Sequence, residues 1–137
     1  MTAYLVDTSV LGRVGRSAVV AERLADLRRA GALWTCDLVT LEIGYSARND
    51  SEWRAVRDAQ AALPQATVTS ETLARAIEVQ GALARRGHHR VAVPDLIIAA
   101  SAEQAEVAVL HYDHDFESIA QETRQPVEWV TRPGSID

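Results

Sequence analysis

The sequence contains no lysine, and all 14 of its basic residues are arginine. This absence excludes Schiff-base chemistry and the phosphate-binding lysine of a P-loop, and no glycine-rich P-loop motif is present either. The arginines are outnumbered by 19 acidic residues, which gives a formal net charge of −5. An acidic chain lacks the broad positive surface of a non-specific nucleic-acid binder, so binding to nucleic acid would require a local arginine cluster.

Cysteine and long apolar runs are also scarce. The single cysteine, Cys36, excludes an internal disulfide and a zinc site built from several cysteines. The apolar runs are too short to cross a bilayer, so no membrane association is expected. The first apolar run has no basic segment before it and is interrupted by Asp7, which argues against a signal peptide. We therefore expect a cytoplasmic protein, and 137 residues suffice for one domain with a single core.

Strands and helices are predicted to alternate along the chain. Short apolar runs indicate strands, whereas apolar residues at helical spacing, with capping residues and glycine or proline stops, indicate helices. Strands are predicted at residues 3–6, 33–36, 66–69, 107–112 and 127–130, and helices at 19–31, 38–47, 50–63, 70–87, 94–106 and from about 114. The predicted inner face of the helix at 70–87 comprises Leu73, Ala76, Ile77, Gln80, Leu83 and Ala84. This alternation predicts a three-layer α/β fold around a mostly parallel sheet.

Acidic residues stand where a parallel sheet would gather them. Asp7 ends the first predicted strand, and Asp113 ends a later strand, with Asp115 two residues on. Glu42 lies in the helix after the second strand, and Asp95 lies in the first turn of a strongly apolar helix. The carboxyl ends of parallel strands share one edge of the sheet, which is where such folds place their sites. We therefore expect these acids to converge although they are far apart in the sequence.

Convergence of four carboxylates requires a compensating charge. Two unit charges about 5 Å apart repel by roughly 3 kcal/mol at an effective dielectric near 20, so six pairs cost on the order of 20 kcal/mol. A divalent cation removes this cost, and ligands that are all oxygen select hard ions. The pattern therefore predicts an Mg²⁺ site, with Mn²⁺ as a substitute, and such a site suits phosphodiester chemistry.

Each acid taken alone also has an ordinary structural explanation. Asp7 in "VDTS" can cap the turn after its strand, and Asp95 can complement the dipole of its helix. Asp113 and Asp115 can form an Asx-turn or cap the next helix. Glu42 can be a solvated helix residue, although it lies in the apolar stretch "LVTLEIGY". The pattern of acids at corresponding positions, rather than any one of them, favours a site.

Four segments carry a resemblance to a known family. "YLVDTSVL", "TLEIGYSA", "VPDLIIAASA" and "VLHYDHDFESI" occur in the order found in the PIN domain, and specifically resemble the VapC toxins of type II toxin–antitoxin modules. The resemblance implies one PIN domain over residues 1–137, folded as an α/β/α sandwich with a mostly parallel five-stranded sheet. It also implies an endoribonuclease that uses Mg²⁺ or Mn²⁺ and leaves a 5′-phosphate and a 3′-hydroxyl.

The resemblance also implies residue roles. Carried over by motif, the catalytic acids are Asp7, Glu42, Asp95 and Asp113, and the metal ligands are Asp7, Asp95, Asp113 and Asp115. Ser9 matches a small polar position that could hydrogen-bond a carboxylate or a water on the metal. The chain departs from the pattern at His111, where the family often has Thr or Ser. We expect His111 to lie behind the metal ligands rather than among them, and His114 to belong to the turn.

Arginines are the predicted RNA-binding residues, and two protein partners are also predicted. Arg13 and Arg16 follow Asp7, and "RRGHHR" supplies Arg85, Arg86 and Arg90 upstream of Asp95; these five are the candidates for binding RNA phosphates. The resemblance further implies a cognate VapB-type antitoxin and a homodimer.

Two other functions fit parts of the sequence. A non-catalytic PIN-like module could use the same acids to bind a basic partner or to hold RNA. A phosphoacceptor receiver domain is also α/β with acids at strand ends, but it requires a late lysine, which this chain lacks.

Overall fold

A parallel sheet of four strands forms the centre of the computed structural model, which describes residues 2–136. The strand order is β2-β1-β3-β4, and each of the three pairings is parallel. The strands are β1 (Tyr4–Val6), β2 (Leu33–Trp34), β3 (Ala108–His111) and β4 (Val127–Trp129). The predicted α/β architecture with a parallel sheet is therefore confirmed.

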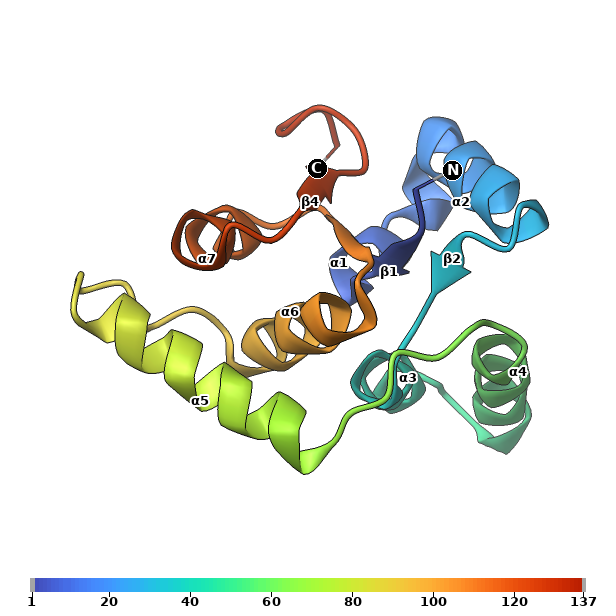
Figure 1. Cartoon of the computed structure of the whole chain (residues 1–137). Helices are drawn as coiled ribbons and strands as arrows, with labels where there is room; N and C mark the ends of the chain where they lie inside the picture. Colours follow the sequence, from blue (N-terminus) through green and yellow to red (C-terminus); the bar gives the residue numbers. More distant parts are fainter. Residues whose placement is uncertain (1, 137) are drawn as a thin grey trace.

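Helices cover both faces of this sheet. Figure 1 shows α2 on one side of the strands, α5, α6 and α7 on the other, and α3 and α4 beyond the β2 edge. The helices are α1 (Thr8–Leu11), α2 (Ala18–Arg29), α3 (Asp37–Tyr45), α4 (Asp50–Ala61), α5 (Ser70–Ala84), α6 (Val93–Ala105) and α7 (Asp115–Thr123), and a 3₁₀ turn spans Val14–Arg16. The short helix α1 was not predicted from the sequence. It turns the chain immediately after β1, at the edge where the acids lie.

Local sequence signals account for where the longer helices begin. The side chains of Ser17 and Asn49 accept hydrogen bonds from the first turns of α2 and α4, at 3.2 and 2.9 Å. Thr69 caps α5 and forms a capping box with Thr72. Pro94 lies in the first turn of α6, where its missing N–H costs no hydrogen bond.

The core divides into two parts because successive strand residues point to opposite faces of the sheet. Leu5 and Val109 pack with α5, α6 and α7, whereas Val6 and Leu110 pack with α2. α6 lies directly against the sheet and is buried along most of its length, which explains its apolar sequence. Despite that composition, no helix within residues 2–136 is long and apolar enough to cross a membrane.

The sheet has four strands instead of the five that the resemblance implied. Residues 66–69, predicted as a strand, form no strand, and the neighbouring chain makes only an isolated parallel bridge between Thr35 and Gln65. Thr35 donates to the Pro64 carbonyl at 3.0 Å and accepts from the Ala66 N–H at 2.8 Å. The pairing extends no further along residues 66–69, because the partner segment enters α3 at Asp37.

Candidate metal centre

The predicted acids gather at the carboxyl edge of the sheet. Asp7 follows β1 directly, and its N–H donates to Leu110 of β3 at 2.9 Å, so the ends of the two strands are adjacent. Asp113 lies two residues after β3, and Asp115 begins α7. Asp95 lies in the first turn of α6, which packs against β1 and β3. Acidic residues from distant parts of the sequence thus lie together at the carboxyl edge of the sheet.

Three carboxylates form the tightest group, which we term the acidic cluster: Asp95, Asp113 and Asp115. Each offers a carboxylate oxygen, and these three oxygens lie within 4.8 Å of one another. Backbone groups hold two of them in place, because the Asp115 N–H donates to Oδ1 of Asp113 at 2.9 Å and the Ala92 N–H donates to Oδ2 of Asp115 at 3.0 Å. The cluster is thus fixed from both α6 and α7.

Asp95 is the acid whose surroundings most favour a cation beside it. Its side chain is 7% exposed, and its Oδ2 is buried with no hydrogen-bond partner among residues 2–136. Burial, together with the charges of Asp7, Asp113 and Asp115, raises the pKa of Asp95 to about 9. Such a carboxyl must either hold a proton or face a cation. Because oxygen ligands prefer hard ions, the donor set fits Mg²⁺ or Mn²⁺.

Asp7 borders the acidic cluster and is fixed by its own turn. It is 3% exposed and caps α1, with Oδ2 accepting from the Ser9 N–H at 2.9 Å. Burial raises the pKa of Asp7, against the opposing effect of hydrogen bonds from Ser9. Ser9 also joins the two strand ends, because its hydroxyl accepts from the Tyr112 N–H at 2.9 Å. Asp7 therefore lies close enough to influence Asp95 electrostatically, but its oxygens are outside the 4.8 Å group.

Glu42 reaches the site from α3. Its Oε1 accepts a hydrogen bond from the hydroxyl of Thr8 at 2.8 Å, and its charge contributes to the raised pKa of Asp7. Thr8 was not among the residues predicted from the sequence. Its position beside Asp7 in "VDTS" was the available signal, but the contact with Glu42 depends on the packing of α1 against α3.

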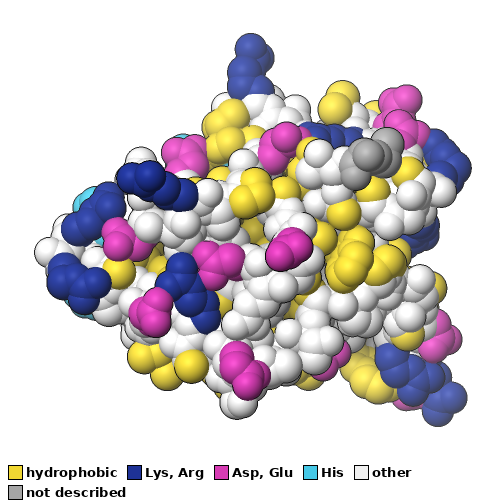
Figure 2. Space-filling model, in the orientation of Figure 1, with side chains coloured by type: hydrophobic (Ala, Val, Ile, Leu, Met, Phe, Trp, Pro, Cys, Tyr) yellow, Lys and Arg dark blue, Asp and Glu magenta, His cyan; other side chains and the backbone are white. Residues whose placement is uncertain are grey.

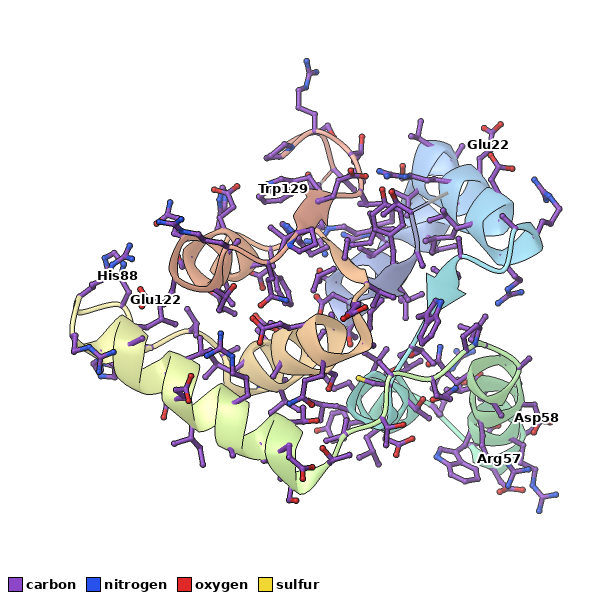
Figure 3. All side chains as sticks on the ribbon, viewed as in Figure 1. Glu22, Arg57, Asp58, His88, Glu122 and Trp129 are labelled. Atoms are coloured by element: carbon purple, nitrogen blue, oxygen red, sulfur yellow. The ribbon has the colours of Figure 1, made fainter. Side chains whose placement is uncertain are left out.

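His111 lies behind the acids, in an aromatic environment. The side chain is completely buried, and its ring lies 5.1 Å from that of Phe116 and 4.8 Å from that of Trp129. Trp129, on β4, is labelled in Figure 3. Nδ1 of His111 accepts from the Asp113 N–H at 3.2 Å, so this lone pair is already engaged. His114 is exposed and lies in the turn before α7, and neither imidazole belongs to the acidic cluster.

The five candidate arginines fall into two kinds. Arg13 packs over the Tyr112 ring, 4.5 Å from its centroid, and donates to the Ser9 carbonyl at 2.7 Å, while Arg86 pairs with Glu122 at 2.9 Å. Arg16, Arg85 and Arg90 are exposed, and none of them forms a salt bridge within residues 2–136. Figure 2 shows arginine and histidine side chains together at the end of the molecule where α5 terminates.

Comparison with known proteins relates the whole chain to one family. The model of the PIN domain matches residues 4–122. Ribonuclease VapC51 of Mycobacterium tuberculosis is 42% identical over 134 residues, which cover 98% of this chain and 97% of that protein. Ribonuclease VapC21 of the same species is 45% identical over 136 residues, covering 98% of each.

Solved structures share the fold at low sequence identity. The DNA-bound VapBC structure from Salmonella typhimurium contains a chain that matches with a TM-score of 0.76 and 17% identity, over 96% of this chain and 100% of that one. A chain of VapBC-5 from Mycobacterium tuberculosis matches with a TM-score of 0.63 and 22% identity, over 96% and 100%. At these identities the likeness concerns the fold alone.

Proposed function

Given that the chain belongs to the PIN domain family and is similar over its length to VapC ribonucleases, we propose that it is an Mg²⁺-dependent endoribonuclease toxin neutralised by a VapB-type antitoxin. The proposal treats residues 1–137 as one PIN domain. Mn²⁺ is expected to substitute for Mg²⁺, because both are hard ions suited to carboxylate ligands.

The acidic cluster is the observation that carries the proposal. Three carboxylates with oxygens within 4.8 Å of one another, one of them buried and without a partner in residues 2–136, are costly unless a cation joins them. A carboxylate that only solvates the surface would be exposed to water, whereas Asp95 is only 7% exposed.

The roles of the residues follow from their positions. Asp95, Asp113 and Asp115 would hold the cation, with Asp7 beside Asp95 as a further ligand. When bound, the cation supplies a site for the scissile phosphate and lowers the pKa of the attacking water. Glu42, which accepts a hydrogen bond from Thr8 and lies close enough to Asp7 to raise its pKa, would orient that water through its carboxylate. Ser9 keeps Asp7 and the end of β3 together.

RNA is the proposed substrate, and exposed arginines would bind its phosphates. Arg90 lies two residues before Ala92, whose N–H donates to Asp115, so the end of the segment 85–91 lies near the acidic cluster, whereas Arg86 at its start pairs with Glu122 toward the end of α7. Arg85 and Arg90 are exposed on this segment, and Arg16 follows the Asp7 turn. Arg13 and Arg86 already have partners within the protein, so RNA phosphates would compete with those partners for them.

Two protein partners belong to the proposal. A VapB-type antitoxin is supported by the similarity to VapC ribonucleases and to structures of VapBC complexes. A basic side chain of the antitoxin would find the acidic cluster a favourable place to bind, in competition with the cation. A homodimer is supported by exposed large hydrophobic side chains on α3, α5 and the start of α6, namely Leu41, Tyr45, Leu73, Ile77 and Val93.

Cleavage-site mapping on total cellular RNA tests the proposal. Wild-type protein with Mg²⁺ is expected to cut at discrete sites, whereas wild type with EDTA and Asp95→Asn with Mg²⁺ are expected to cut at none of them. Asp58→Asn, which removes an exposed carboxylate from α4 (Figure 3), is the matched control and should cut like the wild type. Equal cutting by the wild type and Asp95→Asn would reject the nuclease, and RNA binding without any cleavage would favour the non-catalytic module instead.

A further inference from the structure

His111 is a buried polar side chain that the proposed reaction does not use directly. It is completely enclosed, stacked on Phe116 at an interplanar angle of 30° and covered by Trp129. The ring offers its surroundings only two polar atoms, Nδ1 and Nε2.

The two nitrogens have different surroundings. Nδ1 accepts from the backbone N–H of Asp113 at 3.2 Å, which assigns the ring proton to Nε2. Nε2 is buried and has no hydrogen-bond partner among residues 2–136. The side-chain hydrogen bonding of His111 within the described chain is therefore directed at one group, the backbone of Asp113.

That bond is the first in a series that runs through the acidic cluster. The carboxylate of Asp113 in turn accepts from the Asp115 N–H at 2.9 Å, and the carboxylate of Asp115 accepts from the Ala92 N–H at 3.0 Å. His111 thus fixes one end of the series and Ala92 fixes the other. Two of the three cluster carboxylates lie between these ends.

Packing alone does not account for an imidazole at this position. An unsatisfied buried N–H costs about 1–3 kcal/mol, and a phenyl ring would fill the same aromatic stack without that cost. What an imidazole adds, and a phenyl ring lacks, is the acceptor at Nδ1.

We propose that His111 is a positioning residue for the cation site, because its Nδ1 fixes the backbone of Asp113 and, through Asp113, the carboxylates of Asp113 and Asp115. The inference rests on the proposed function, since the site that is positioned is the proposed cation site. His111 is not itself a ligand: its Nδ1 lone pair is taken by the Asp113 N–H.

Two substitutions separate the acceptor from the packing. His111→Phe keeps an aromatic ring between Phe116 and Trp129 but removes the acceptor. His111→Asn loses the ring but keeps an acceptor, because an Asn side chain can hydrogen-bond the backbone N–H two residues on. Val109→Ala is the matched control: Val109 is completely buried two residues earlier in β3, on the same face, so its truncation removes packing without touching the Asp113 N–H.

Calorimetric titration of each protein with Mn²⁺, without RNA, is the test, and a thermal melt by circular dichroism reports folding. His111→Phe is expected to bind Mn²⁺ roughly 10- to 100-fold more weakly while melting near the wild-type temperature. His111→Asn and Val109→Ala are expected to melt earlier but to bind Mn²⁺ close to wild-type strength.

Two results would overturn the inference while leaving the proposed function in place: wild-type Mn²⁺ affinity in His111→Phe, or affinities that simply follow the melting temperatures across the variants. A wild-type protein that bound no Mn²⁺ would instead overturn the proposed cation site, and this inference with it. The titration of the wild-type protein therefore distinguishes a failure of the proposed cation site from a failure of the role assigned to His111.

Discussion

The hydroxyl of Thr8 donates a hydrogen bond of 2.8 Å to Oε1 of Glu42, and so joins the turn after β1 to α3. The turn also contains Asp7, and the charge of Glu42 contributes to the raised pKa of that carboxylate. This hydroxyl therefore links Glu42 of α3 to the turn that contains Asp7.

Removing that hydroxyl should reduce activity without removing an acid. Hydrogen bonds to charged groups contribute about 1.5–3 kcal/mol, so Thr8→Val is expected to lower kcat/KM by about tenfold or more. Thr8→Ser keeps the donor and should restore most of the activity. Initial rates on a fixed RNA substrate measure this, and equal rates for Thr8→Val and Thr8→Ser would contradict the role assigned to the bond.

The raised pKa of Asp95 predicts how the stability of the metal-free protein depends on pH. Between the ordinary pKa of 3.8 and the folded value of about 9, the folded chain holds a proton that the unfolded chain has released. Stability is therefore greatest at low pH within this window and falls as the pH rises, by up to about 1.4 kcal/mol per pH unit. Burial of Asp7 acts in the same direction.

Urea unfolding in EDTA at pH 5 to 8 checks this slope. In Asp95→Asn the amide imitates the protonated acid, so the slope is expected to flatten and the metal-free protein to be more stable than the wild type at pH 8. Mg²⁺ should stabilise the wild type increasingly as the pH rises, because its ligands must be deprotonated. A slope that is the same in Asp95→Asn and in Asp58→Asn would show that Asp95 is not its source.

The exposed arginines of the segment 85–91 should control the salt dependence of RNA binding. Each lost phosphate contact reduces the slope of log K against log salt by about 0.7 for single strands, so Arg85→Ala/Arg90→Ala is expected to reduce it by roughly 1.4. Fluorescence anisotropy measures RNA binding at a series of salt concentrations. The arginine variants are made in an Asp95→Asn background, which prevents cleavage during the titration. Arg28→Ala/Arg29→Ala, on exposed positions of α2, is the matched control and should leave the slope unchanged.

The exposed apolar residues of α5 should control self-association. Ile77 is 70% exposed, and Ile77→Glu is expected to shift a dimer to a monomer in sedimentation velocity. Val19 is 62% exposed on α2, so Val19→Glu makes the same kind of change, from an exposed apolar side chain to an acid, on another helix. This control should remain dimeric. A wild-type protein that is monomeric at its highest soluble concentration would contradict the proposed dimer.

The sequence predicted more of the architecture than of the packing. Asp7, Asp95 and Asp113 are placed near one another by strand ends and a helix start, which short-range patterns specify. The burial of α5 was predicted less well. Leu73 and Ile77 were expected inside but are exposed. The residues that are buried on α5, Thr72, Ala76, Val79 and Leu83, also follow helical spacing, so only the position of α6 decides between the two faces.

The contacts around His111 lay further beyond prediction. Strand alternation places His111 and Asp113 on one side, but the sequence does not state that Trp129 of a different strand would cover the ring. Nor does it state that Thr8 would hold Glu42, since that bond spans 34 residues and depends on two helices meeting. Contacts of this kind are set by tertiary packing rather than by local pattern.

The bond between the Tyr112 N–H and the Ser9 hydroxyl joins groups 103 residues apart, and β1 has no pairing with β3 until the last third of the chain is present. A chain still being synthesised on the ribosome therefore exposes Asp7 and Glu42 long before Asp113 exists to meet them. Nuclease activity cannot precede near-complete translation, so a truncated or stalled chain that ends before β3 would be harmless to the RNA around it.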